Sequence, residues 1–178
     1  MANTNGTLEF SHLSSGMPGL TQRYGDALAE AAAVCLDDCG HGSGVEMAVN
    51  GDIAGAYDLN WSPVVDEQMR MTWNDDQFAT EQGAYGLAIL LMSEARAFTV
   101  VERSRKGTRF DYWLGDEGDE LFVRKARLEV SGIRRGLQHE INTRVRQKTS
   151  QIDSSSVQLP GIVAVVEFSI PLAWIVDR

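Results

Sequence analysis

The chain has 178 residues, of which 43% are hydrophobic and 23% are charged. This length and composition suit one globular domain, or one domain with an added layer, and argue against disorder throughout. No run approaches the roughly 20 apolar residues of a membrane span. The polar start, Met1 to Leu20, also lacks the basic and apolar regions of a signal peptide. We therefore expect a cytoplasmic protein without a membrane partner.

The net charge of −9 is unevenly distributed along the chain. Residues 1–100 contain 3 Lys or Arg and 14 Asp or Glu, whereas residues 101–178 contain 13 and 11. A uniformly acidic surface would repel a polyanion, but a local basic face is enough to bind one. The charge split therefore permits a nucleic-acid partner for the second half without proving one.

The first 73 residues predict an accessory layer of one helix and two short strands. Residues 1–20 indicate an irregular lead-in, and helical spacing of apolar residues predicts a helix over 21–39. Cys35 and Cys39 share a face of that helix, where buried thiols fit better than a zinc site completed by His41. Strands are expected over 45–50 and 56–61, around a turn at Asn50-Gly51-Asp52. The acidity of this layer suits a basic partner protein or a homodimer.

Residues 74–178 predict an α/β core with a central mixed sheet flanked by helices. Asn74 and Gln77 resemble a capping box that opens a helix ending near Ala95. Strands follow over 98–102 and 109–114, and a third follows an acidic turn at 116–120 and ends near Ser131. A second helix then carries Leu137, Ile141 and Val145. The apolar run 162–168 indicates a strand buried on both faces, and 172–176 a short edge strand.

Strand alternation places two acidic side chains on one side of this expected sheet. Asp111 and Glu129 project from the same side if their strands pair, and Glu81 in the preceding helix can reach over it. Three carboxylates suit Mg²⁺ or Mn²⁺, which prefer oxygen ligands and can activate a water on a phosphodiester. The plainer interpretation is a solvated face of mixed charges.

The order of these elements resembles the core of the PD-(D/E)XK phosphodiesterase superfamily, which includes restriction enzymes, resolvases and repair nucleases. By this resemblance Asp111 matches the metal-binding aspartate, Glu129-Val130-Ser131 the second half-motif, and Glu81 the glutamate that many members carry in the first helix. The resemblance implies a restriction endonuclease-like fold and a magnesium-dependent nuclease acting on DNA, in repair or in defence against foreign DNA. The alternative is an inactive subunit of this fold that binds nucleic acid or a partner protein.

One departure from the family pattern concerns the catalytic cation. The family usually has a lysine where this chain has Ser131, and a hydroxyl cannot stabilise developing charge as a cation does. Arg127 and Lys125 lie on the same strand face as Glu129 and are candidates to replace it. Arg135 or Gln138, on the following helix, are further candidates.

Basic residues of the second half form two clusters, in which arginine and lysine can bind phosphates. The first surrounds a turn between two strands, and the second lies on and before the last helix. The clusters contain Arg103, Arg105, Lys106 and Arg109, and Arg134, Arg135, Arg144, Arg146 and Lys148. The alternative is that these cations balance acidic residues within the protein.

Overall fold

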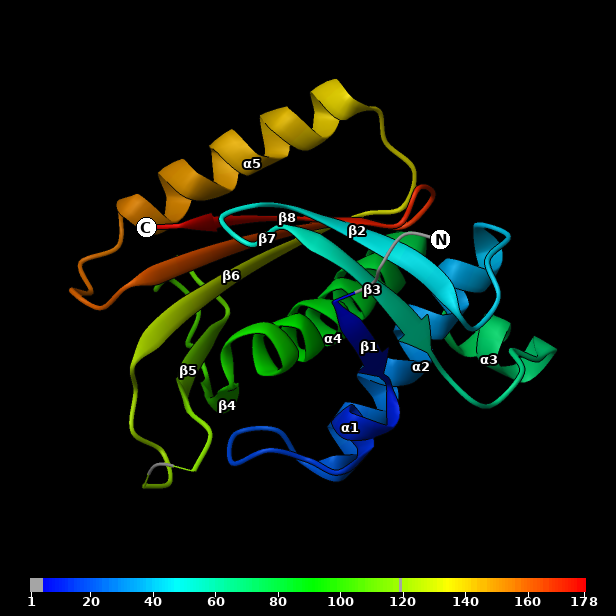
Figure 1. Ribbon diagram of the computed structural model, residues 1–178, viewed down its shortest axis with the longest axis horizontal. Helices are drawn as coiled ribbons and strands as arrows, with labels where there is room; N and C mark the ends of the chain where they lie inside the picture. The colour runs from blue at the N-terminus through cyan, green and yellow to red at the C-terminus, as the bar shows by residue number, and fades with distance from the viewer. Residues whose placement is uncertain (1–4, 119) are drawn as a thin grey trace.

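The computed structural model describes residues 5–118 and 120–178, and it has an eight-stranded mixed sheet with helices on both faces (Figure 1). The expected α/β class and flanked mixed sheet are therefore confirmed. The strands are β1 (Gly6–Glu9), β2 (Val45–Gly51), β3 (Gly55–Asn60), β4 (Phe98–Arg103), β5 (Tyr112–Asp116), β6 (Ala126–Ile133), β7 (Gly161–Glu167) and β8 (Leu172–Asp177). The helices are α1 (Ser11–Ser14), α2 (Gln22–Asp38), α3 (Glu67–Thr72), α4 (Asp76–Arg96) and α5 (Gln138–Asp153).

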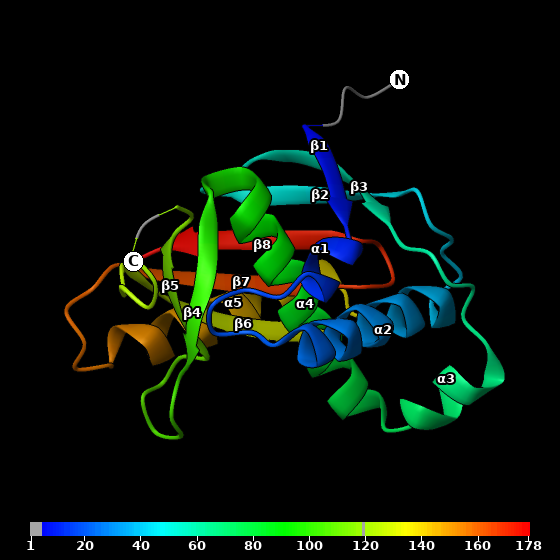
Figure 2. The same cartoon turned by 90° about the horizontal axis from the view of Figure 1, so that it is seen from below.

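The strand order across the sheet is β1-β3-β2-β8-β7-β6-β5-β4. Viewed from below, α1, α2 and α4 lie in front of the sheet, and α5 lies behind it (Figure 2). Two apolar clusters match these two layers, a large one that includes α2 and α4 and a smaller one that includes residues of α5. The sheet is thus covered on both faces around its middle strands, as expected for strands with unbroken apolar sequences.

The middle of the chain runs α4, β4, β5, β6, α5 and β7. Strands β4, β5 and β6 pair antiparallel, whereas β7 pairs parallel to β6 after the chain crosses over through α5. All seven residues of β7 are buried, and the strand lies between β6 and β8. The expected interior strand at 162–168 is confirmed.

The N-terminal strands belong to this same sheet. Strand β2 pairs parallel with β8, in the register Ala48 with Leu172, and β1 and β3 extend the sheet beyond it. The expected edge strand at 172–176 is therefore an interior strand, because β2 covers the edge that the sequence pattern left open. The expected lead-in was also wrong where the structure describes it. Leu8, Phe10 and Leu13 are buried in β1 and α1, while residues 1–4 lie outside the described residues.

Helix α4 begins one residue later than the capping box suggested. The Asp75 carboxylate, not Asn74, accepts a hydrogen bond of 2.8 Å from the Phe78 N–H. The glycines within α4 pack against α2 rather than the sheet, since a Cβ at Gly83 would lie 3.1 Å from the Ala32 Cα. At Gly132 of β6, a Cβ would lie 2.5 Å from the Thr80 carbonyl oxygen, so glycine lets α4 approach the sheet beside the acidic residues.

The sequence pattern does not predict α3. Its N-cap Asp66 nevertheless accepts a hydrogen bond of 2.9 Å from the Met69 N–H, as a helix start requires. Cys35 is buried, its Sγ lies 3.3 Å from the Ala79 carbonyl oxygen, and burial raises its pKa to about 12. Within the described ranges, no helix combines the length and apolar character needed to cross a membrane.

Candidate active site

Asp111 lies directly before β5 and is held by two hydrogen bonds to β6 and one to α4. Its N–H donates to the Leu128 carbonyl at 2.8 Å, and its Oδ2 accepts from the Val130 N–H at 2.9 Å. Its Oδ1 accepts from the Tyr85 hydroxyl of α4 at 3.0 Å. The expected strand at 109–114 begins later, at Tyr112, because Arg109 has a left-handed φ of 73° that interrupts the extended chain.

Glu129 lies in the middle of β6, and only 2% of the residue is exposed. Its Oε1 accepts from the Lys148 ammonium at 2.5 Å and from the Gln151 amide at 2.9 Å. Burial, followed by the negative charge of Asp111, raises the pKa of Glu129 to about 7, despite the opposing effect of Lys148. Asp111 and Glu129 line the same pocket, so the structure brings these two predicted residues together.

Glu81 reaches the pair only through an intermediate residue. Its carboxylate accepts from the Tyr85 hydroxyl at 2.7 Å, and the same hydroxyl contacts Asp111. A hydroxyl has one hydrogen to donate, so the two carboxylates share it. Among residues 5–118 and 120–178, no three His, Cys, Asp or Glu side chains form a group arranged to hold a metal ion. Glu81 thus stands one hydroxyl away from the acidic pair, and the expected set of three metal ligands stays a prediction.

Arg127 does not reach Glu129, contrary to the expectation that it replaces the family lysine. It is buried, and its guanidinium donates to the Leu159 carbonyl at 2.8 Å and to the Ile152 carbonyl at 3.1 Å. These bonds join β6 to the end of α5 and to the loop that follows. Arg127 therefore holds the backbone in place rather than a reacting group.

The other residues expected to replace the family lysine also have partners away from Glu129. Lys125 lies 3.6 Å from Asp116, Arg135 bonds the Asp38 carboxylate at 2.9 Å, and the Gln138 amide donates to Asn142. None of these contacts involves the Asp111–Glu129 pair.

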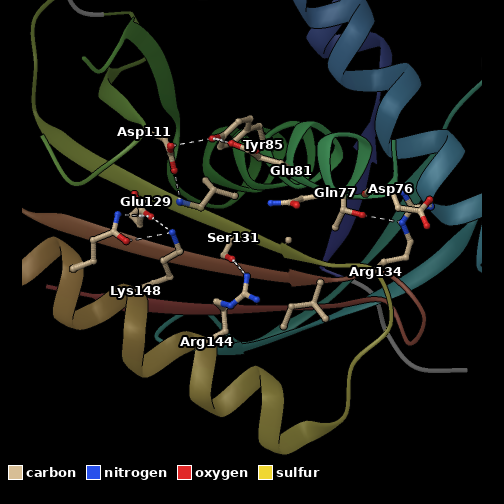
Figure 3. A pocket seen from close by; sticks show the side chains of 15 residues that line it. Asp76, Gln77, Glu81, Tyr85, Asp111, Glu129, Ser131, Arg134, Arg144 and Lys148 are labelled. Carbon is tan, nitrogen blue, oxygen red and sulfur yellow. Dashed lines mark hydrogen bonds and ion pairs between the residues drawn. The ribbon is translucent and has the colours of Figure 1, made fainter. Parts of the chain in front are cut away.

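Lys148 supplies the cation that the sequence pattern lacks after Glu129. It lies on α5, which covers the sheet face from which Glu129 projects (Figure 3). The sequence pattern places this lysine only in a phosphate-binding cluster and does not predict its contact with the carboxylate. The signal was its spacing, since Ile141, Lys148 and Ile152 lie seven and four residues apart and so share the buried face of the helix.

Ser131 follows Glu129 on the same face of β6, and its hydroxyl accepts from the Arg144 guanidinium at 2.7 Å. These groups line a pocket of about 610 Å³ that also contains Asp111, Glu129 and Lys148. Figure 3 shows the acidic pair and the cations facing the same space between α4 and α5. The pocket therefore combines ligands for a cation with ligands for an anion.

The two expected basic clusters divide into paired and unpaired cations. Arg134 and Arg135 both bond Asp38, and Arg134 also bonds Thr80, so these two balance charge within the protein. The guanidinium of Arg103 lies over the rings of Tyr85 and Tyr112, at 4.8 Å from each centroid. Arg109 donates to the Ser154 hydroxyl at 2.6 Å. Arg146 is exposed and contacts Thr143 on its own helix.

Arg105 and Lys106 are exposed between β4 and β5. With Arg103 and Arg109 they line a second pocket of about 470 Å³, which shares Asp111 and Glu129 with the first. The acidic pair thus lies where two pockets with basic linings meet.

Comparison with known proteins adds no family assignment. No family model, no curated protein and no solved structure matches this chain.

Proposed function

We propose that this chain is a magnesium-dependent nuclease that hydrolyses phosphodiester bonds in DNA. The observation that carries the proposal is the meeting of Asp111 and Glu129 beside Lys148 in an open polar pocket. A carboxylate pair with an adjacent ammonium is the minimum needed to hold a hard cation and to neutralise charge at phosphorus. Glu129 would be a costly residue to bury for structure alone, because burial disfavours its charged form.

The donor set at this site fits a magnesium ion. Mg²⁺ keeps several waters and needs only one or two carboxylates from a protein. The Val130 carbonyl, from a residue that lines the same pocket, would offer a third oxygen. In a strand, the N–H and C=O of one residue point to the same side. The Val130 N–H donates to Asp111, and Val130 lies beyond the last paired residues of β5 and β6, so its C=O points toward Asp111 without a partner strand there. Glu81 would act at one remove, by sharing the Tyr85 hydroxyl with Asp111.

Each residue has a distinct role in this proposal. A bound magnesium ion would supply charge neutralisation and a water of lowered pKa. Asp111 is held in one orientation by Tyr85 and by the Val130 N–H, so little reorganisation is needed when a ligand arrives. Lys148 opposes the rise in the pKa of Glu129 that burial causes, and the donor left after its bonds to Glu129 and Gln151 can contact a phosphate oxygen. Gln151 fixes Glu129 from the same helix.

The order of the central elements supports the same proposal. The sequence resembles a PD-(D/E)XK core in the order helix, three strands, helix and buried strand. The elements α4, β4, β5, β6, α5 and β7 follow one another in this order. In this interpretation Lys148 of α5 replaces the lysine that the family usually carries on the strand.

A second candidate function is a non-catalytic subunit that binds nucleic acid through the same pockets. The observation in its favour is that Glu129 is already satisfied by Lys148 and Gln151 without a metal ion. A site of this kind would hold its shape and bind phosphate without hydrolysing it.

Asp111→Asn tests the choice between the two functions, because it keeps the side-chain shape and removes the charge that attracts the cation. In the proposed nuclease, cleavage of single- and double-stranded DNA requires Mg²⁺ or Mn²⁺, and the variant loses it. Asp116→Asn, at the other end of β5, is the matched control. If wild-type protein cleaves no substrate while retaining DNA binding, the subunit function replaces the nuclease.

A further inference from the structure

Arg144 lines the 610 Å³ pocket and, within the described part of the chain, has no acidic partner there. One of its nitrogens donates to the Ser131 hydroxyl at 2.7 Å. No carboxylate pairs with Arg144 among residues 5–118 and 120–178, whereas Arg134 and Arg135 pair with Asp38 and Arg178 pairs with Asp153. A guanidinium carries five N–H donors, so most of those on Arg144 remain for a ligand.

The Ser131 hydroxyl fixes where that unpaired charge lies. Ser131 is buried in β6, and its bond holds the Arg144 guanidinium against the wall of the 610 Å³ pocket (Figure 3). An arginine held in this way loses less conformational freedom when it binds an anion than a mobile surface arginine does. The serine therefore has a use in this chain beyond standing at the position of the family lysine.

The spacing along β6 relates this charge to the acidic pair. Ser131 and Glu129 project from the same face and are two residues apart, so their Cα atoms lie about 7 Å apart. Arg144 precedes Lys148 by one helical turn, about 5–6 Å along α5. If one phosphate of a substrate lies at Asp111 and Glu129, a phosphate next to it would thus face Arg144.

We propose that Arg144, positioned by the Ser131 hydroxyl, forms a separate subsite for a phosphate group next to the reacting phosphate of a nucleic-acid strand. This inference rests on the proposed function, since it takes the Asp111–Glu129 pair as the site of the reacting phosphate. It adds that the substrate must extend beyond that phosphate on the α5 side. Arginine suits the subsite because its planar fork binds two phosphate oxygens at once.

The test measures binding separately from cleavage, by fluorescence anisotropy of a labelled oligonucleotide with chelator present, over a range of salt concentrations. Arg144→Ala should weaken binding about tenfold and should lower the slope of log affinity against log salt by about one, as expected for loss of one phosphate contact. Arg144→Lys should keep most of that slope but not the full affinity. Ser131→Ala should weaken binding less than Arg144→Ala.

Arg146→Ala is the matched control, because Arg146 lies on the same helix but is exposed and contacts only Thr143 among the described residues. It should change affinity and slope much less. Replacing single phosphates of the oligonucleotide by neutral methylphosphonates should identify one position where wild type and Arg144→Ala bind equally. Thermal melting of each variant checks that the fold is retained.

The outcomes separate the two proposals. If wild type binds oligonucleotides and Arg144→Ala behaves as Arg146→Ala does, the subsite is wrong while the nuclease proposal stands. If wild type binds no oligonucleotide, the proposed function fails and the subsite fails with it. If inorganic phosphate or a mononucleotide competes as well as the oligonucleotide, Arg144 binds a lone phosphate and the extended-strand inference is overturned.

Discussion

The Nζ of Lys148 lies 2.5 Å from Oε1 of Glu129, and the lysine reaches this carboxylate from α5 rather than from the strand that carries it. Because the two residues belong to different elements, the geometry of the pair depends on how α5 packs on β6 and β7. Gln151 and Arg144, from the same helix, depend on that packing in the same way.

Lys148→Met should remove the charge while roughly keeping the length of the side chain. We expect metal-dependent cleavage to fall about 10²-fold or more, as for loss of one charge-stabilising group in a transition state. The pKa of Glu129 should rise further, because the ammonium that opposes its rise is gone. Single-turnover rates and a carboxyl titration by NMR measure the two effects. Arg146→Ala, on the outer side of α5, should leave both unchanged.

The raised pKa of Glu129 predicts how the stability of the metal-free protein depends on pH. The folded state holds this proton more tightly than the unfolded state, in which the pKa is near 4.5. The contribution to stability is therefore complete below about pH 4.5 and is lost as the pH rises through 7. We expect a loss on the order of 3 kcal/mol, at about 1.4 kcal/mol for each pKa unit between the folded and unfolded values. Urea unfolding between pH 4.5 and 8 should show it in wild type and not in Glu129→Gln.

Tyr85→Phe should loosen Asp111 and disconnect Glu81 from it, because it removes the hydroxyl that both carboxylates share. We expect affinity for Mn²⁺ to fall about tenfold, as for loss of a residue that orients a metal ligand. Calorimetric titration with Mn²⁺ measures the change. A variant that binds Mn²⁺ as wild type does would limit Tyr85 to packing against Tyr112.

Arg127→Ala should act on stability rather than on the chemistry. It removes the guanidinium that donates to the Leu159 carbonyl and one of the two donors to the Ile152 carbonyl, which keeps the Ser155 N–H, at a cost of about 2–3 kcal/mol. At temperatures where the variant stays folded, cleavage per folded molecule should stay within a few-fold of wild type. Arg124→Ala is the control, since its pair with Glu102 is exposed and contributes about 1 kcal/mol or less. A large fall in rate without loss of stability would return Arg127 to the active site.

Gly25→Ala tests the contact between α1 and α2, where a Cβ would lie 1.9 Å from the Leu13 carbonyl oxygen. We expect a loss of about 3 kcal/mol, because backbone atoms cannot move aside as a flexible side chain can. Gly42→Ala is the matched control, with nothing within 4 Å of the added Cβ. Thermal unfolding of both variants gives the comparison.

The sequence predicted those parts of the molecule that local patterns determine. Apolar periodicity marks α2 and α5, a long apolar sequence marks α4, which is buried on nearly all sides, and the continuous apolar run of β7 indicates an interior strand. Alternation in β6 correctly separated Glu129 and Ser131 from Leu128 and Val130, because side-chain direction in a strand has a period of two. These features depend on neighbours in the sequence.

What the sequence could not predict depends on residues that lie far apart along the chain. Nothing near Leu172 indicates that β2 covers β8, and β1 with α1 gains its burial from β3 and α2. Arg127 looked available because its partners, the Ile152 and Leu159 carbonyl groups, are more than twenty residues away. For Lys148 the local pattern does contain the signal, because its spacing places it on the buried face of α5. The prediction used only its positive charge.

The parallel pairing of β2 with β8 has a consequence for how the chain folds during synthesis. Strand β2 leaves the ribosome well before β8, because Ala48 and its partner Leu172 are 124 residues apart, so β2 must wait with one edge unpaired. Contacts between such distant segments slow folding, and open strand edges promote aggregation. We therefore expect refolding yields to fall with protein concentration and chains truncated before Leu172 to accumulate as aggregates, even though residues 5–118 and 120–171 contain both carboxylates and Lys148.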